Sequence, residues 1–172
     1  MPLTKISTHG ITDGTIVNTD VSSTAAIATS KLGAGAVLQI VFGEYATGVI
    51  TTSSSYVDTN VSASITPSSS SNKILIVYDI NSLSASTSTT GAGIALYRNS
   101  TAIYSSDAYA GYSASGGLIY ANSSGNYFDS PSTTSSTTYS LKVKRSIGSG
   151  NIEVQTNGIS SSITLMEIKA WL

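Results

Sequence analysis

The chain has 172 residues, of which 10% are charged, and its formal net charge is −1. So neutral a chain lacks the basic field that attracts nucleic acid or an anionic membrane surface, and neither is expected as a partner. It contains no cysteine, which excludes disulfides and cysteine-based metal sites. Serine and threonine together make up 56 residues, and such an uncharged coat suits permanent packing against copies of itself or against a large assembly.

The composition predicts an all-β fold. Hydrophobic residues reach 40% of the chain, enough for a core, and they include many Ile, Val, Leu and Tyr. These residue types favour strands, whereas the Glu, Lys, Arg and Gln of exposed helix faces are scarce. The polar N-terminus predicts no secretory signal, and no apolar run approaches the roughly 20 residues of a membrane span.

Residues 1–35 follow a pattern of their own. Apolar side chains recur every five positions, at Ile6, Ile11, Ile16 and Val21, a period that fits neither a helix nor a strand. Turn-forming residues fill the gaps, as in short extended pieces joined by bends. Such a stretch cannot bury its isoleucines against itself, so we expect an extended arm that lies in a groove or winds with identical chains. A pentapeptide-type solenoid and a disordered segment are the alternatives.

A short helix is predicted near the end of this arm. Ser23 or Thr24 can cap residues 25–32, which are long enough for two turns. A helix that short needs a docking partner to be stable. Ile27 and Leu32 therefore join the four spaced apolar residues as predicted anchoring contacts of the arm.

Residues 36–172 are predicted to form a globular head of short strands. Val37–Tyr45 is predicted as a mostly buried strand with a bulge at Gly43. Lys73–Leu83 is apolar on both faces, as a central strand would be. From Ile94 onwards four separate short strands are predicted, with the sequences IALYR, TAIYS, GLIYA and NYFDS. About seven to nine strands separated by turns favour a β-sandwich or a jelly roll.

The last predicted strand carries apolar side chains on both of its faces. One face is assigned to the core and the other to a symmetry mate, which makes Met166, Ile168 and Trp171 candidate oligomer contacts. A central position in a larger sheet is the alternative explanation. Glu167 would be costly to bury alone, so it is expected to pair with Lys169 or with a neighbouring chain.

The sequence predicts no enzyme, no cofactor and no metal site. Its single histidine, His9, lies in the arm, and its acidic residues are scattered singly among strand ends. Residues 97–127 hold six of the ten tyrosines amid serine and glycine, a composition typical of binding loops. Tyr109 and Tyr112 are therefore candidate ligand contacts. The alternative is that these tyrosines belong to the core and only their hydroxyls reach water.

Several stretches resemble structural proteins of tailed bacteriophages. The stretch DGTIVNTDVSSTAAIATSKL (Asp13–Leu32) is similar to a connector that recurs in such proteins, notably in marine phages and cyanophages. Val37–Val41, Ser53–Ile80 and Ser161–Trp171 resemble the module that often follows this connector. The resemblance implies a non-enzymatic, homotrimeric virion protein with a β-sandwich head.

That resemblance sets the functional expectation. In this family the module usually ends a longer fibre, whereas here only residues 1–35 precede the head, which favours a short knob on the virion surface. The expected role is a capsid cement or decoration protein whose arm binds the major capsid protein. The alternative is a short tail fibre or receptor-binding tip that binds a tail or adaptor protein and recognises a host surface glycan.

Overall fold

The computed structural model describes residues 22, 32–113 and 119–170. The chain divides into two compact units, Met1–Leu32 and Gly33–Leu172. Of the first unit only Ser22, which is exposed, and Leu32, which is half-buried, are described. The predicted extended arm and its short helix therefore lie outside the described residues. The same holds for the anchoring residues Ile6, Ile11, Ile16, Val21 and Ile27.

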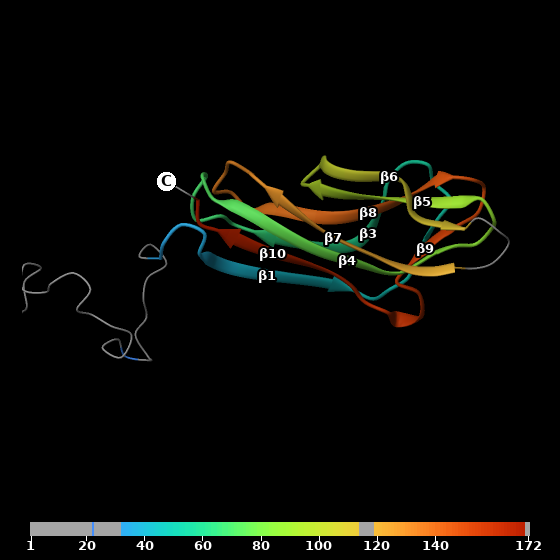
Figure 1. Ribbon diagram of the computed structural model, residues 1–172, viewed down its shortest axis with the longest axis horizontal. Coiled ribbons are helices and arrows are strands. Elements are labelled where there is room, and N and C mark those ends of the chain that lie inside the picture. The colour runs from blue at the N-terminus through green and yellow to red at the C-terminus, as the bar shows by residue number, and fades with distance from the viewer. Residues whose placement is uncertain (1–21, 23–31, 114–118, 171–172) are drawn as a thin grey trace, which may run out of the picture. The chain divides into compact units, whose positions relative to one another are not determined.

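The described part of the second unit is built almost entirely of strands (Figure 1). One 3-10 turn, η4 (Thr156–Gly158), precedes the last strand. In chain order the strands are β1 (Val37–Tyr45), β2 (Val49–Thr51), β3 (Val57–Ile65), β4 (Lys73–Ala85), β5 (Thr90–Arg98), β6 (Thr101–Ser113), β7 (Ile119–Asp129), β8 (Thr137–Ile147), β9 (Ile152–Val154) and β10 (Ser161–Ile168).

The strands form two antiparallel sheets with the connectivity of a jelly roll. The first sheet has the order β1-β10-β4-β7, and the short strands β9 and β2 extend it beside the end of β4. The second sheet has the order β3-β8-β5-β6. Among these eight long strands the chain changes sheet at every connection except the β5–β6 hairpin, which is the double Greek key of a jelly roll. The predicted all-β sandwich is confirmed.

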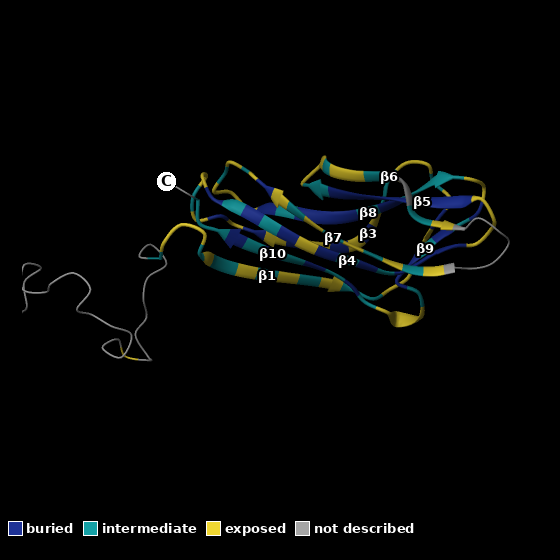
Figure 2. Cartoon of the chain, viewed as in Figure 1, coloured by how far each residue is buried: buried dark blue, intermediate teal, exposed yellow. Residues whose placement is uncertain are grey.

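Alternating side chains bring the two sheets together. In β3 and β10 buried residues strictly alternate with more exposed ones, the period-2 pattern of a strand with one face on the core. In β8 the side chains of Tyr139, Leu141 and Val143 share one face, and all three are fully buried. Figure 2 shows buried and less buried positions alternating along much of β4.

Strand β1 differs from its prediction as a mostly buried strand. It lies at the edge of its sheet and none of its residues is buried. Its bulge lies between Val37 and Gln39, and not at Gly43. Gly43 instead marks the close approach of the two sheets, because a Cβ there would overlap the backbone carbonyl of Ser62 on β3. The apolar pattern was correct, but it did not reveal that one face of β1 is uncovered.

The four short strands predicted after Ile94 are in fact three long ones, β5, β6 and β7. The polar run Asn122–Asn126 does not end β7, because all of it except Asn122, which lies at a bulge, pairs with β4. Gly125 within it lies opposite Tyr78, whose hydroxyl fills the space that a Cβ would need. Glycine here therefore serves a close contact inside a strand rather than a turn.

Candidate interaction surface

The position of β10 settles part of the prediction for the last strand. It lies between β1 and β4 and pairs with both, so it is a central strand, as the alternative explanation held. Ile163 and Leu165 point into the core and are fully buried. Met166 and Ile168 alternate with them and lie half-buried on the outer side of the sheet. Trp171, the third predicted oligomer contact, lies outside the described residues.

The outer side of this sheet is mainly apolar. Residues directly opposite one another on paired strands share a face, so the strand registers define rows across β1, β10, β4 and β7. Two neighbouring rows are Ile40–Met166–Leu75–Phe128 and Phe42–Thr164–Val77–Asn126. Val37 and Ile168 stand together in the row before them. We call the eight apolar residues of these three rows, Val37, Ile40, Phe42, Leu75, Val77, Phe128, Met166 and Ile168, the outer apolar face.

Several of these side chains are widely exposed. The exposed fraction is 61% for Ile40, 59% for Phe42 and 55% for Phe128. Isolated exposed apolar residues are normal, but a contiguous group across four strands is typical of interaction sites, which makes this face a candidate for one. Burying one such side chain completely contributes about 1.5–3 kcal/mol, so covering this face is a substantial driving force for association.

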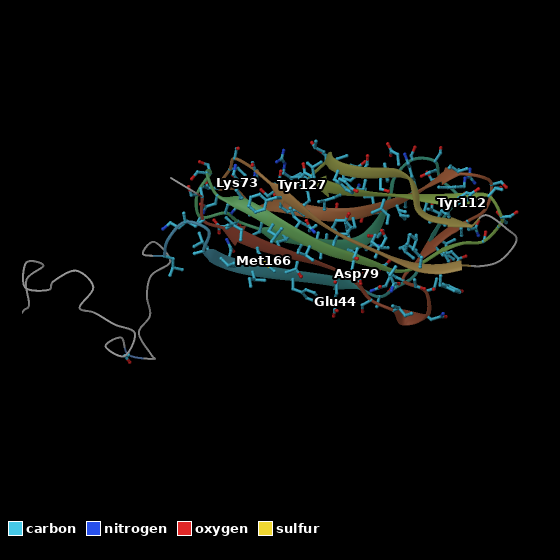
Figure 3. The ribbon with its side chains drawn as sticks, viewed as in Figure 1. Glu44, Lys73, Asp79, Tyr112, Tyr127 and Met166 are labelled. Carbon is cyan, nitrogen blue, oxygen red and sulfur yellow. The ribbon has the colours of Figure 1, made fainter. Side chains whose placement is uncertain are left out.

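Charged groups mark the two ends of the outer apolar face. Lys73 stands at one end, opposite Ile168, and its Nζ donates to Ser130 Oγ at 2.7 Å. At the other end Glu44 and Asp79 flank Ser162 on its two sides. Figure 3 shows Lys73 and Asp79 well apart on β4. The face is therefore apolar in the middle, basic at one end and acidic at the other.

A buried carboxylate lies directly beneath the face. Glu167, between Met166 and Ile168, is fully buried on the inner side of β10. Its Oε2 accepts a hydrogen bond from Gln39 Nε2 at 2.6 Å. Its Oε1 accepts three more, from Asn72 Nδ2 at 2.6 Å, from Ser68 N at 2.7 Å and from Ser68 Oγ at 2.8 Å.

These contacts correct the expected pairing of Glu167 with a cation. The hydrogen bonds to its carboxylate come from neutral donors on β1 and on the turn before β4. Burial alone would raise the pKa of Glu167, but the hydrogen bonds from Gln39, Asn72 and Ser68 outweigh it and hold the pKa below its usual range. The group therefore stays ionised and ties three segments together.

A second buried acid lies in the row of inward-facing residues that contains Glu167. Asp129, opposite Ile74 on β4, is almost fully buried. Arg98 Nη1 donates to its two oxygens at 2.9 and 3.0 Å, and Tyr139 Oη donates to Oδ2 at 2.6 Å. Burial, followed by the hydrogen bond to Asp129 and its charge, raises the pKa of Tyr139. This cluster joins β7 to β5 and β8 of the opposite sheet.

The outer side of the second sheet has a different chemistry. Lys144 Nζ lies 4.5 Å from the ring centre of Tyr56, and Lys142 Nζ lies 4.6 Å from that of Tyr97. Asp107 Oδ1 accepts hydrogen bonds from Tyr56 Oη at 2.7 Å and from Lys144 Nζ at 2.9 Å, and these two contacts, in that order, lower its pKa. On the outer side of this sheet these aromatic rings and charged groups thus already contact one another within the chain.

The predicted ligand-contacting tyrosines are only partly placed. Tyr112 on β6 has 39% of its surface exposed, whereas the side chain of Tyr109 lies outside the described residues. The rings of Tyr104 and Tyr127 are tilted by 44° with their centres 6.2 Å apart, and Tyr127 also packs on the core. The alternative of core tyrosines thus holds for Tyr127, and ligand contact by Tyr109 and Tyr112 stays a prediction.

Sequence reasoning missed most of the outer apolar face. It selected Met166 and Ile168 but not Ile40, Phe42 or Phe128. A signal was present, because Val37–Tyr45 carries apolar residues on both sides of the strand, as Lys73–Leu83 does. That pattern was explained by burial on both faces, although the outer face of each strand is exposed in part.

Residues 32–113 and 119–170 contain no group of three or more His, Asp or Glu side chains that could hold a metal ion. In the same part of the chain no helix is long and apolar enough to cross a membrane.

Comparisons with known proteins give distant likenesses among solved structures and none among sequences. No protein-family model matches the chain, and no curated protein matches its sequence. Among solved structures, the chain is similar to a chain in the structure of infectious bursal disease virus, Gx strain, with 16% identity and a TM-score of 0.35. The match covers 77% of the present chain and only 37% of the viral chain.

Proposed function

We propose that this protein is a non-enzymatic structural component of a bacteriophage virion, a homotrimeric cement or decoration knob on the capsid surface. The observation that carries the proposal is the outer apolar face, which fits a protein that works while packed against others. The uncharged Ser/Thr coat agrees with permanent packing. The resemblance of Asp13–Leu32 to phage connectors supports the location on a virion and the homotrimeric state.

In this proposal residues 1–35 attach the head to the major capsid protein. Each apolar residue of the arm that enters a pocket contributes about 1.5–3 kcal/mol, whereas ordering the backbone costs roughly 1–2 kcal/mol per residue. One arm alone would therefore bind weakly. Three arms on one trimer raise the effective concentration of each for its site, which makes attachment durable.

The alternative is a short tail fibre or receptor-binding tip. The tyrosine-rich β6, with the exposed Tyr112, is the feature that favours it, since tyrosine set among small polar residues suits glycan or protein recognition. The two roles differ in copy number. Quantitative gel densitometry of purified virions distinguishes them, because a capsid decoration is present in hundreds of copies and a tail appendage in some tens or fewer.

We expect a chain that begins at Gly35 to fold and yet not attach to virions, because it keeps the whole sandwich and lacks the anchoring arm. Circular dichroism and thermal unfolding check the fold, and cosedimentation with particles that lack the protein checks attachment. The full chain is the control. Attachment of the shortened chain at the full chain's level would reject the arm as the anchor.

A further inference from the structure

We propose that the outer apolar face pairs with the same face of a second copy of this chain, about a two-fold axis that lies between the two facing sheets and runs across their strands. This deepens the proposed function, because it names the partner of that surface. The pairing itself requires only the head, and its test is independent of the virion.

The distribution of charge on the face is the first argument. Lys73 stands at one end, while Glu44 and Asp79 stand at the other, on the two sides of Ser162. A two-fold axis that crosses the strands at the middle of the face superposes opposite ends of the two copies. Lys73 of each copy then lies over Asp79 at the acidic end of the partner subunit, so the face is complementary to itself.

The apolar rows agree with the same axis. The rows that contain Ile40 and Phe42 are the central two, and the axis places each over the other. Phe42 on the edge strand β1 then comes over the partner's Ile40, within the roughly 30° rotation of packed sheets. Both side chains are more than half exposed in the single chain, and pairing would cover them.

The size of the face sets the strength of the pairing. Four strands at about 4.8 Å and seven residues at about 3.4 Å make a footprint of about 450 Å² per copy. A standard interface uses about 800 Å² per partner, and a specific one clears about 1,000 Å² in total. The pairing is therefore weak between free molecules and becomes strong where copies are held side by side.

The symmetry of this contact also limits its role. A face that pairs with itself closes after two copies, so it cannot hold three copies in a ring. Met166 and Ile168 would then join two heads, and a trimer would need another surface. On a particle, such pairs would link heads of neighbouring assemblies, which is what a cement protein must do.

The test uses full-length chains with reversed charges. Lys73→Glu alone and Glu44→Lys/Asp79→Lys alone each place like charges together in a two-fold pair, so each should raise the dissociation constant for pairing about tenfold or more. An equimolar mixture of the two variants places opposite charges together at both ends, so pairing should return. A fluorescently labelled Lys73→Glu chain, titrated with the unlabelled second variant in a sedimentation or anisotropy experiment, measures this directly.

Matched controls separate charge from folding and from general stickiness. Ile159→Ser removes an exposed apolar side chain outside the four strands and should leave pairing unchanged, whereas Phe42→Ser/Phe128→Ser should abolish pairing that no mixture restores. Failure of the mixture to restore pairing overturns the proposal. The proposal is also overturned if Phe42→Ser/Phe128→Ser self-associates like the unmodified chain. It is overturned as well if this variant loses only its attachment to particles, because the face would then bind the capsid protein. A variant that no longer pairs but still attaches to particles leaves the proposed virion function intact.

Discussion

Replacing Glu167 with alanine is expected to lower the free energy of unfolding by about 3 kcal/mol. The carboxylate accepts four hydrogen bonds in a fully buried position. Without it the buried amide of Asn72 loses its charged acceptor and keeps Ser68 Oγ at 3.2 Å, while the exposed Ser68 can turn to water. Both effects keep the loss below the sum of four bonds. Urea unfolding followed by tryptophan fluorescence or circular dichroism measures the change.

The same group predicts a dependence of stability on pH. The pKa of Glu167 is lowered in the folded state, so the folded protein binds fewer protons than the unfolded chain at pH values between the two pKa values. Its contribution to stability is complete above the ordinary glutamate pKa of about 4.3 and is lost as the pH falls through the lower folded value.

The matched control for both effects is Glu167→Gln, which keeps the shape and removes the charge. Its stability should vary less than that of the unmodified protein as the pH falls from about 5 to 3. An unchanged pH profile in this variant would show that Glu167 is not the titrating group. A Glu167→Ala protein as stable as the unmodified one would contradict the role of the four hydrogen bonds.

Strand periodicity was the most dependable feature of the sequence. Because side chains alternate strictly along a strand, the sequence of β8 places Tyr139, Leu141 and Val143 on one face, and all three are fully buried. The same regularity predicts nothing about what lies beyond the outer face. An edge strand with one apolar face uncovered, such as β1, and a strand buried on both sides have the same pattern, so the exposure of Ile40 and Phe42 could not be predicted.

Contacts between distant segments were beyond sequence reasoning for a different reason. Glu167 meets Asn72 across 95 positions of the chain and Gln39 across 128. Nothing local indicates that these amides face a carboxylate, because the jelly-roll connections bring β10 between β1 and β4. Pairing with Lys169 was the natural local hypothesis. The neutral donors to Glu167 could be identified only once the strand order was known.

The chain order of the sandwich explains why the candidate surface is discontinuous in sequence. The four strands of the outer apolar face come from the start, the middle and the end of the head, since the jelly roll alternates between its two sheets. Met166 and Ile168 could be selected because both lie on one strand. Phe128 could not, because its register with Leu75 depends on the pairing of β7 with β4.

Asp129→Ala is expected to destabilise the fold by about 3 kcal/mol, because it breaks a largely buried ion pair and hydrogen-bond cluster. The fully buried hydroxyl of Tyr139 would lose its acceptor. Arg98 would lose its counter-charge, but its side chain is 30% exposed and can turn to water, which reduces the loss. Asp129→Asn keeps an acceptor for the hydroxyl and should lose less. Urea unfolding at neutral pH compares the variants.

A double-mutant cycle identifies which contact matters. Tyr139→Phe should cost about 1 kcal/mol in the unmodified protein and nearly nothing in Asp129→Ala, where the hydroxyl has already lost its acceptor. A coupling free energy of about 1 kcal/mol is therefore expected between the two positions. Additive losses would mean that the 2.6 Å contact between Tyr139 Oη and Asp129 Oδ2 contributes little. The stability of this end of the sandwich would then come from the pairing of Asp129 with Arg98, which holds β7, and with it Phe128, against the opposite sheet.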